Sequence, residues 1–184
     1  LGIHTRDQMW QCIENGLRRV GVEYFDFYQL WDMSAPEHFA AGCVGADSPL
    51  QAMREARDQG LIRHLGFTSH DTRGLTLEWL AQIPDFKIAT LYYNFNDRAP
   101  EQVLEYAADH GVGTVIMGPL RGGLLVGESG VFSDALPELA GLPIQEIALR
   151  FLLGTRGVTT VISGMVELEQ LRQNAAVADL AEPM

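Results

Sequence analysis

The chain has 184 residues, of which 47% are hydrophobic and 20% are charged, and its formal net charge at pH 7 is −11. This composition is typical of a globular protein with one sizeable core, and the acidic balance argues against nucleic acid and anionic membranes as partners, because both attract a basic face. No run of apolar residues approaches the roughly 18 that a transmembrane helix needs.

A capping box opens the first predicted helix. Thr5 and Gln8 have the spacing at which the two side chains satisfy each other's backbone N–H groups. We expect the helix to continue to Arg19 and to end at Gly21, since glycine readily adopts the left-handed conformation that closes a helix. The aromatic and apolar run over 23–31 then predicts a buried strand.

The alternation of helix and strand continues to the end of the chain. A loop containing Pro36 is expected after the first strand, and Ser48 and Pro49 have the residue types that begin a helix, which we expect to reach Gln59 and stop at Gly60. The remaining strands are predicted at 63–68, 87–94, 113–117 and 159–163, and the remaining helices at 75–82, 100–110, 143–153 and 166–176.

Strict alternation of apolar strands with helices predicts a parallel α/β sheet that is covered on both faces. A complete (β/α)8 TIM barrel uses about 250 residues, or roughly 31 per unit, so this chain has room for about six units. We therefore expect a single domain over residues 1–184 that forms a partial barrel, whose sheet edges need another segment for closure. A doubly wound open sheet is the competing fold, but no GxGxxG motif follows the first strand.

Two apolar strands end in loops of small residues, and these loops carry the clearest functional signal. The segment 115–117 leads into Gly118-Pro-Leu-Arg-Gly-Gly123, and 161–162 leads into Ser163-Gly-Met165. Backbone N–H groups can close around an anion only where side chains are small, and the second loop runs directly into a helix whose dipole favours the same anion. The pattern predicts a site for a phosphate-bearing cofactor at the carboxyl ends of the strands.

Five blocks along the chain resemble the aldo-keto reductase family, in its bacterial predicted-oxidoreductase branch. The blocks are 17–28, 52–69, Tyr93-Asn94, Gly118-Pro-Leu120 and 169–174. The resemblance implies that the chain covers roughly strands 4–8 of the family barrel, its C-terminal and cofactor-binding part. It also implies reduction of a small aldehyde or ketone, without a metal, by hydride from NADPH.

The same resemblance places the family's catalytic Asp, Tyr and Lys in the first three strand units, which this chain does not contain. The resemblance therefore implies no catalytic residue within this chain. The isolated chain is predicted to be inactive without the missing N-terminal segment. Trp31 stands where the family has a His. It is interpreted either as a bulky wall of the barrel mouth or as a residue that shapes the substrate pocket, since indole cannot transfer a proton as imidazole can.

The resemblance also implies which residues contact the cofactor. Thr68, Ser69 and Thr90 would hold the nicotinamide carboxamide, and Met117 would pack on the ring. The phosphate-binding loop would comprise Gly118, Pro119, Leu120, Arg121, Gly122 and Gly123. The adenosine end would be contacted by Ser163, Gly164, Met165, Gln170, Gln173 and Asn174. NADPH is expected over NADH, although Gln170 replaces the Arg that often binds the 2′-phosphate, which leaves that preference open.

Structural explanations compete with several of these assignments. Thr68 and Ser69 could cap the following helix, Arg121 could be a surface charge, and Met117 could fill the core. Gln173 and Asn174 could belong to an exposed polar helix face.

Two other functions remain open at this point. One is a nicotinamide-binding scaffold or regulatory pseudoenzyme without turnover, which Trp31 favours slightly. The other is a metal-dependent hydrolase built on His70 and Asp71, although the remaining histidines lack ligand spacing and a capping pair is the preferred interpretation. Cys12 and Cys43 have neither metal-ligand spacing nor the density of a disulfide framework, so we expect a reducing cytoplasm.

Overall fold

The computed structural model describes residues 2–71, 74–127, 139 and 141–180. Its five strands form one parallel sheet, and their spatial order is the same as their order along the chain. The strands are β1 (Phe25–Leu30), β2 (Ile62–Ser69), β3 (Phe86–Tyr92), β4 (Gly113–Met117) and β5 (Thr160–Val161). Among the described strands, β1 pairs with β2 alone and β5 pairs with β4 alone, so the sheet that they form is open.

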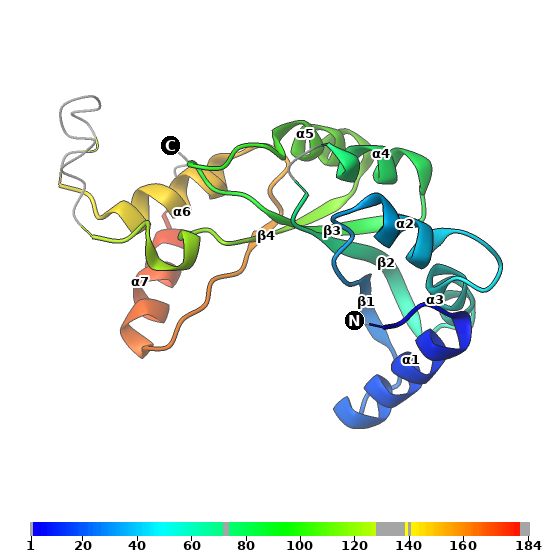
Figure 1. Ribbon diagram of the computed structural model, residues 1–184. Coiled ribbons are helices and arrows are strands. Elements are labelled where there is room, and N and C mark those ends of the chain that lie inside the picture. The colour runs from blue at the N-terminus through cyan, green and yellow to red at the C-terminus, as the bar shows by residue number, and fades with distance from the viewer. Residues whose placement is uncertain (1, 72–73, 128–138, 140, 181–184) are drawn as a thin grey trace.

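Helices connect the strands and follow the curve of the sheet (Figure 1). In that view α4 and α5 lie above the sheet, α1 lies at one end of the arc and α7 at the other. The helices are α1 (Arg6–Val20), α2 (Pro36–Cys43), α3 (Pro49–Asp58), α4 (Leu75–Gln82), α5 (Glu101–His110), α6 (Ile144–Gly154) and α7 (Leu168–Ala178), with one 3-10 turn, η1 (Arg121–Gly123). No helix in the described part of the chain is both long and apolar enough to cross a membrane.

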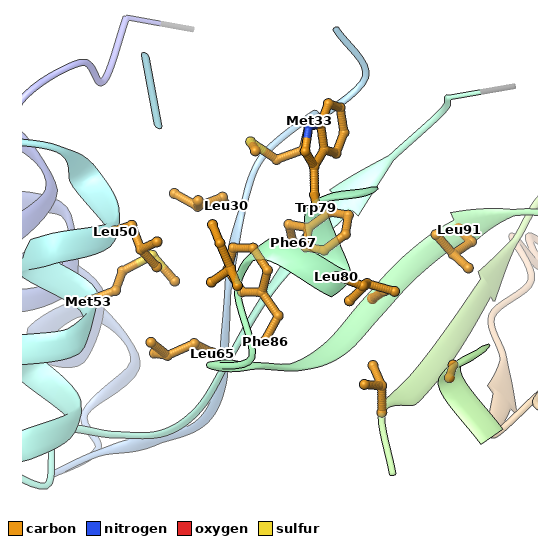
Figure 2. Packing of buried hydrophobic residues seen from close by; sticks show 14 of the residues in the cluster. Leu30, Met33, Leu50, Met53, Leu65, Phe67, Trp79, Leu80, Phe86 and Leu91 are labelled. Atoms are coloured by element: carbon orange, nitrogen blue, oxygen red, sulfur yellow. The ribbon is translucent and has the colours of Figure 1, made fainter. Parts of the chain in front are cut away.

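The core lies between the sheet and its helices. Successive side chains of a strand point to opposite faces, and alternate residues of β2 and β3 are fully buried: Leu65, Phe67 and Leu91 are at most 2% exposed. Figure 2 shows Phe67 and Phe86 packed beside one another, and their ring centroids are 4.9 Å apart. Leu50 and Met53 close this cluster from α3.

The other face of β1 is largely uncovered. Phe27 is 54% exposed and Trp31, directly after the strand, is 69% exposed. Phe27 stacks on His64 of the neighbouring strand, with ring centroids 5.3 Å apart. This face is the concave side of the curved sheet, toward which the inward residues of a barrel would point.

The helix and strand pattern predicted from the sequence is confirmed in most places. The Thr5–Gln8 capping box is present, and Gly21 has φ 74° and donates its N–H to the Leu17 carbonyl. The elements 75–82 and 113–117 have the predicted bounds, and the other predicted helices and strands differ by a few residues at their ends.

Ser48 is the N-cap of α3 and Pro49 its first residue, as predicted, although the Ser48 side chain makes no capping hydrogen bond. Two details of the prediction are wrong. The loop expected around Pro36 contains α2, because proline at the first helical position has a φ that suits a helix start. The last strand, expected over 159–163, is reduced to Thr160–Val161, since the chain leaves the sheet edge directly into the loop that follows.

Candidate functional site

The two small-residue loops predicted to bind a cofactor lie together around one cavity of about 480 Å³. The first loop follows β4, and the second follows β5 and leads to α7. The cavity brings together most of the predicted cofactor residues: Gly118, Pro119, Leu120, Gly122, Gly123, Ser163, Gly164, Met165, Gln170, Gln173 and Asn174. Its lining also includes four residues that the sequence did not indicate: Val126, Gly127, Gln145 and Ile162.

Pairing of β4 with β5 places both loops at the same edge of the sheet. Val115 is opposite Thr160, and the Ile162 N–H donates to the Ile116 carbonyl at 2.9 Å. Just before β5, the side chains of Thr114 and Thr159 exchange hydrogen bonds, because each hydroxyl oxygen accepts the other residue's backbone N–H at 3.0 Å. The register of this short pairing is therefore fixed by side chains as well as by backbone.

The loop after β4 needs glycine for two different reasons. Gly118 has φ 71°, and a Cβ at this position would lie 2.1 Å from Cε2 of Tyr92. Gly122 and Gly123 have φ 65° and 93°, and a Cβ on either would meet no atom within 4 Å. Gly118 thus permits close packing against β3, whereas Gly122 and Gly123 permit the left-handed turn and leave the cavity open.

The loop after β5 lines the cavity and carries backbone donors without a protein acceptor among the described residues. Gly164 has open space around it, since a Cβ there would meet nothing within 4 Å. Within the part of the chain that the structure describes, the N–H groups of Ser163, Gly164 and Met165 donate to no protein acceptor. Neighbouring backbone N–H groups of this kind are suited to an anion or to the oxygen atoms of a ligand.

The start of α7 is partly closed by its own side chains. Glu167 is the N-cap and forms a capping box with Gln170. The side-chain oxygen of Gln170 in turn accepts the N–H groups of Val166 at 2.9 Å and Glu167 at 3.2 Å. The N–H groups of Val166 and Glu167 are therefore engaged by the Gln170 side chain, whereas those of Leu168 and Glu169 have no acceptor among the described residues. The charged group at the N-cap is negative.

Five predicted cofactor residues do not line this cavity: Thr68, Ser69, Thr90, Met117 and Arg121. The Ser69 hydroxyl is 2% exposed, donates to the Met33 carbonyl and accepts from Thr76 Oγ1 and the Asp71 N–H, each at 3.0 Å. The donor of Ser69 is thus already used inside the protein, by the Met33 carbonyl and not in capping α4, whose N-cap is Gly74.

The other four lie on or beside the concave face. The Thr68 hydroxyl accepts the Asp32 N–H at 2.8 Å, and the Thr90 hydroxyl donates to Oε1 of Gln29 at 2.8 Å. Met117 pairs in register with Tyr92, beside the first loop. Arg121 is exposed and has φ 47°.

Trp31 lies at the end of β1 and lines a separate cavity of about 220 Å³ with Asp32, Met33, His4 and His38, among others. Within the described residues, no three His, Cys, Asp or Glu side chains are grouped so that they could hold a metal ion.

The capping interpretation of Asp71 is confirmed. Its Oδ2 accepts the N–H of Thr76, in the first turn of α4, at 3.2 Å. His70 lies next to Tyr92, with ring centroids 6.1 Å apart.

Comparison with known proteins gives the family. The profile of the Aldo/keto reductase family matches residues 3–182. The chain belongs to this family. An uncharacterized oxidoreductase of Bacillus subtilis strain 168, YqkF, is 25% identical in an alignment 191 positions long, gaps included, which covers 92% of this chain and 60% of the relative.

Solved structures agree with this family. A crystal structure of the thermostable aldo-keto reductase Tm1743, in complex with the inhibitor epalrestat, is 31% identical, has a TM-score of 0.75, and covers 97% of this chain and 63% of that one. The holo form of AKR11C1 from Bacillus halodurans has a TM-score of 0.77 at 24% identity and covers 98% of this chain and 61% of that one. At that identity the second likeness concerns the fold alone.

The matched relatives are longer than this chain. It spans 60% of the B. subtilis oxidoreductase and 61% and 63% of the two solved structures. The parallel α/β sheet described above is thus an aldo/keto reductase fold of the TIM-barrel type, and the activity of a whole family member is a matter of proposal for this chain.

Proposed function

We propose that this chain is the nicotinamide-binding part of an aldo/keto reductase, a single domain whose β1 to β5 correspond to strands 4–8 of the family barrel. In the complete barrel, NAD(P)H would reduce the carbonyl group of a small aldehyde or ketone. We also propose that the protein works in a reducing cytoplasm, as expected from its two cysteines.

The observation that carries this proposal is the cavity between the loops after β4 and β5. Its volume of about 480 Å³ lies in the range of small-molecule sites. The residues fit a nucleotide, because Gly122, Gly123 and Gly164 leave the cavity open, and because Ser163, Gly164 and Met165 line it with N–H groups that have no acceptor among the described residues. The amide side chains of Gln173 and Asn174 add polar groups suited to the edge of an adenine ring.

When bound, the cofactor would supply a hydride to the carbonyl carbon of the substrate. The chain's own residues would bind and orient it. The β4 loop would hold the diphosphate through backbone N–H groups, the β5 loop would hold the adenosine ribose, and Met117 and Thr90 would face the nicotinamide from the concave side of the sheet. Thr68, Ser69 and Arg121 would also contact the cofactor. For Ser69 this requires its hydroxyl to give up its present hydrogen bond to the Met33 carbonyl.

The proton for the product alkoxide would have to come from outside this chain. A phenol becomes acidic enough for that role beside a cation such as lysine. Lys87 is the only lysine in the sequence. It is the second residue of β3 and therefore lies at the amino end of the sheet, opposite the edge that carries the cavity. We accordingly propose that the 184-residue chain alone binds cofactor without reducing a carbonyl.

The alternative function is a nicotinamide-binding scaffold or pseudoenzyme, which the exposed Trp31 in the place of the family His favours. The two functions share the cavity and differ in turnover once the rest of a barrel is present. A reductase would then oxidise NAD(P)H in the presence of an aldehyde, whereas a scaffold would not.

The proposal is tested by titrating the chain with NADH and with NADPH and following nicotinamide fluorescence. At least one of them should bind, and Gly164→Val should abolish binding, because Gly164 lines the cavity and its backbone accepts a side chain without strain. Gly2→Val is the matched control, since Gly2 likewise has space for a side chain and lies outside the cavity. The proposal would be refuted if neither NADH nor NADPH bound. It would also be refuted if the Gly164→Val variant bound the cofactor as tightly as the unsubstituted chain.

A further inference from the structure

We infer that Glu167 closes the first turn of α7 to a second phosphate, so that the cavity takes NADH in preference to NADPH. This inference rests on the proposed function, and it runs against the expectation of NADPH that follows from the family resemblance. It concerns the one place where the two cofactors differ, the 2′-position of the adenosine ribose.

The chemical difference between the two cofactors is large. NADPH carries an additional phosphate, which at pH 7 adds a charge of about −1.5 to −2 and three strong hydrogen-bond acceptors. A protein holds such a group with cations or with free N–H groups at a helix start, and a carboxylate in the same place repels it. NADH has only a hydroxyl at this position, which neutral polar groups can accommodate.

Some of the N–H groups at the helix start are occupied, whereas those of Leu168 and Glu169 have no acceptor among the described residues. Oε1 of Gln170 accepts the N–H groups of Val166 and Glu167, within the capping box that Gln170 forms with Glu167. Gln170 itself lines the cavity. A phosphate that used the N–H groups of Val166 and Glu167 would have to displace the amide oxygen of Gln170, and it would lie at a helix start whose N-cap residue is a carboxylate.

The charge around this end of the cavity is also unfavourable for a second phosphate. No lysine or arginine lines the cavity among the described residues. The sequence contains none from Gly157 to Leu171 and none from Gly122 to Leu149, while the carboxylate of Glu167 stands at the N-cap of α7. Arg172, the next cation along the helix, faces Glu169, with 3.7 Å between Nη1 and Oε2.

The loop before α7 remains available to ligand oxygen atoms. Among the described residues, the N–H groups of Ser163, Gly164 and Met165 have no acceptor, and they suit the ribose hydroxyls and the diphosphate that both cofactors share. Discrimination therefore lies in the Glu167–Gln170 capping box.

The test compares the dissociation constants of NADH and NADPH for the chain and for two variants. Glu167→Gln removes the charge and keeps a side-chain oxygen for the capping box. Glu169→Gln removes one negative charge from the same helix and serves as the control, since Glu169 takes no part in the Glu167–Gln170 capping box and faces Arg172. The ratio of the two constants cancels any effect on folding or on the shared part of the site.

We expect the unsubstituted chain to bind NADH about tenfold more tightly than NADPH. Glu167→Gln should narrow that ratio by about threefold or more through tighter NADPH binding, and Glu169→Gln should leave it unchanged. Equal or tighter binding of NADPH by the unsubstituted chain would show that the loop N–H groups hold the second phosphate despite Glu167, and would overturn the inference while leaving the cofactor site intact. An unchanged ratio in Glu167→Gln would also overturn it. Failure of both cofactors to bind would refute the proposed function and the inference together.

Discussion

The guanidinium group of Arg6, at the start of α1, contacts both carboxylate oxygen atoms of Glu55 in α3. Its Nε lies 3.0 Å from Oε1 and 2.9 Å from Oε2, and its Nη2 lies 2.8 Å from Oε2. Nε1 of Trp10 donates to the same carboxylate at 3.0 Å. These bonds, with that of Arg6 the strongest, lower the pKa of Glu55 from 4.5 to about 2.

The Arg6–Glu55 contact predicts a loss of stability in acid. A carboxyl whose pKa is lower in the folded state stabilises the fold above its unfolded pKa, and that contribution disappears as the pH falls from about 4.5 to about 2. Glu55→Gln should lower the urea midpoint at pH 7 and flatten its decline over this range. Glu14→Gln, an exposed glutamate of α1, is the control. Parallel pH profiles for the Glu55→Gln variant and the unsubstituted chain would contradict this prediction.

Gly66 is expected to be required by the sheet. A Cβ there would lie 2.1 Å from the backbone oxygen of Ile88, at the register shift between β2 and β3. Gly66→Ala should reduce the free energy of unfolding by about 3 kcal/mol or more, because backbone of the neighbouring strand must move. Gly113→Ala in β4 is the matched control, since its Cβ would lie 3.6 Å from the Lys87 oxygen, an ordinary contact. Equal denaturation midpoints for the two variants would disprove this expectation.

The raised pKa of the Tyr93 phenol predicts that the folded protein loses stability at alkaline pH. Burial, together with a 3.0 Å hydrogen bond to Glu101, raises the pKa of its phenol from 10.0 to about 12. A group with a raised folded pKa stabilises the fold below its unfolded pKa, so this contribution is lost as the pH rises from about 10 to about 12.

The matched variant is Tyr93→Phe, which should cost about 1 kcal/mol at pH 7 through the lost hydrogen bond. It should also lose less stability than the unsubstituted chain when thermal unfolding is compared at pH 9 and pH 11. An identical alkaline shift in both proteins would assign the loss to other groups.

Restoring the family's imidazole should not create activity in this chain. Trp31 is 69% exposed, so Trp31→His should change stability by less than about 0.5 kcal/mol. Under the proposed function the proton donor and its lysine are still absent, and neither the chain nor this variant should oxidise NADH or NADPH in the presence of an aldehyde. A related aldo-keto reductase assayed in parallel gives the positive control, and turnover by either protein would refute the assignment.

The fold could be predicted from the sequence because its signals are local. The Thr5–Gln8 spacing, Gly21 and the apolar run 113–117 each specify an element through neighbouring residues. Helix α2 was missed because it has only eight residues and its first, Pro36, is as common in loops as at helix starts.

The candidate site was predictable where it is built from loops and less so where it depends on distant partners. The glycines of the β4 and β5 loops indicated the cavity directly. The Ser69 hydroxyl donates to the carbonyl of Met33, 36 residues away, and the Thr90 hydroxyl donates to the side chain of Gln29, 61 residues away. No local sequence pattern reveals such pairs. The closure of α7 by Glu167 could have been inferred, since Glu167 and Gln170 have the spacing of a capping box.

The shortness of β5 has a consequence for hydrogen exchange. Two residue pairs, the Ile162–Ile116 hydrogen bond and the Thr114–Thr159 exchange join this edge strand to β4 alone. With so few contacts, the edge that carries half of the cavity can open locally without global unfolding. Its amides should exchange faster than those of β2 and β3, which pair on both sides. A ligand that binds only the closed edge slows that exchange in proportion to its concentration over its dissociation constant. Amide protection of Thr160 to Ile162 would then report cofactor affinity in a chain that performs no turnover.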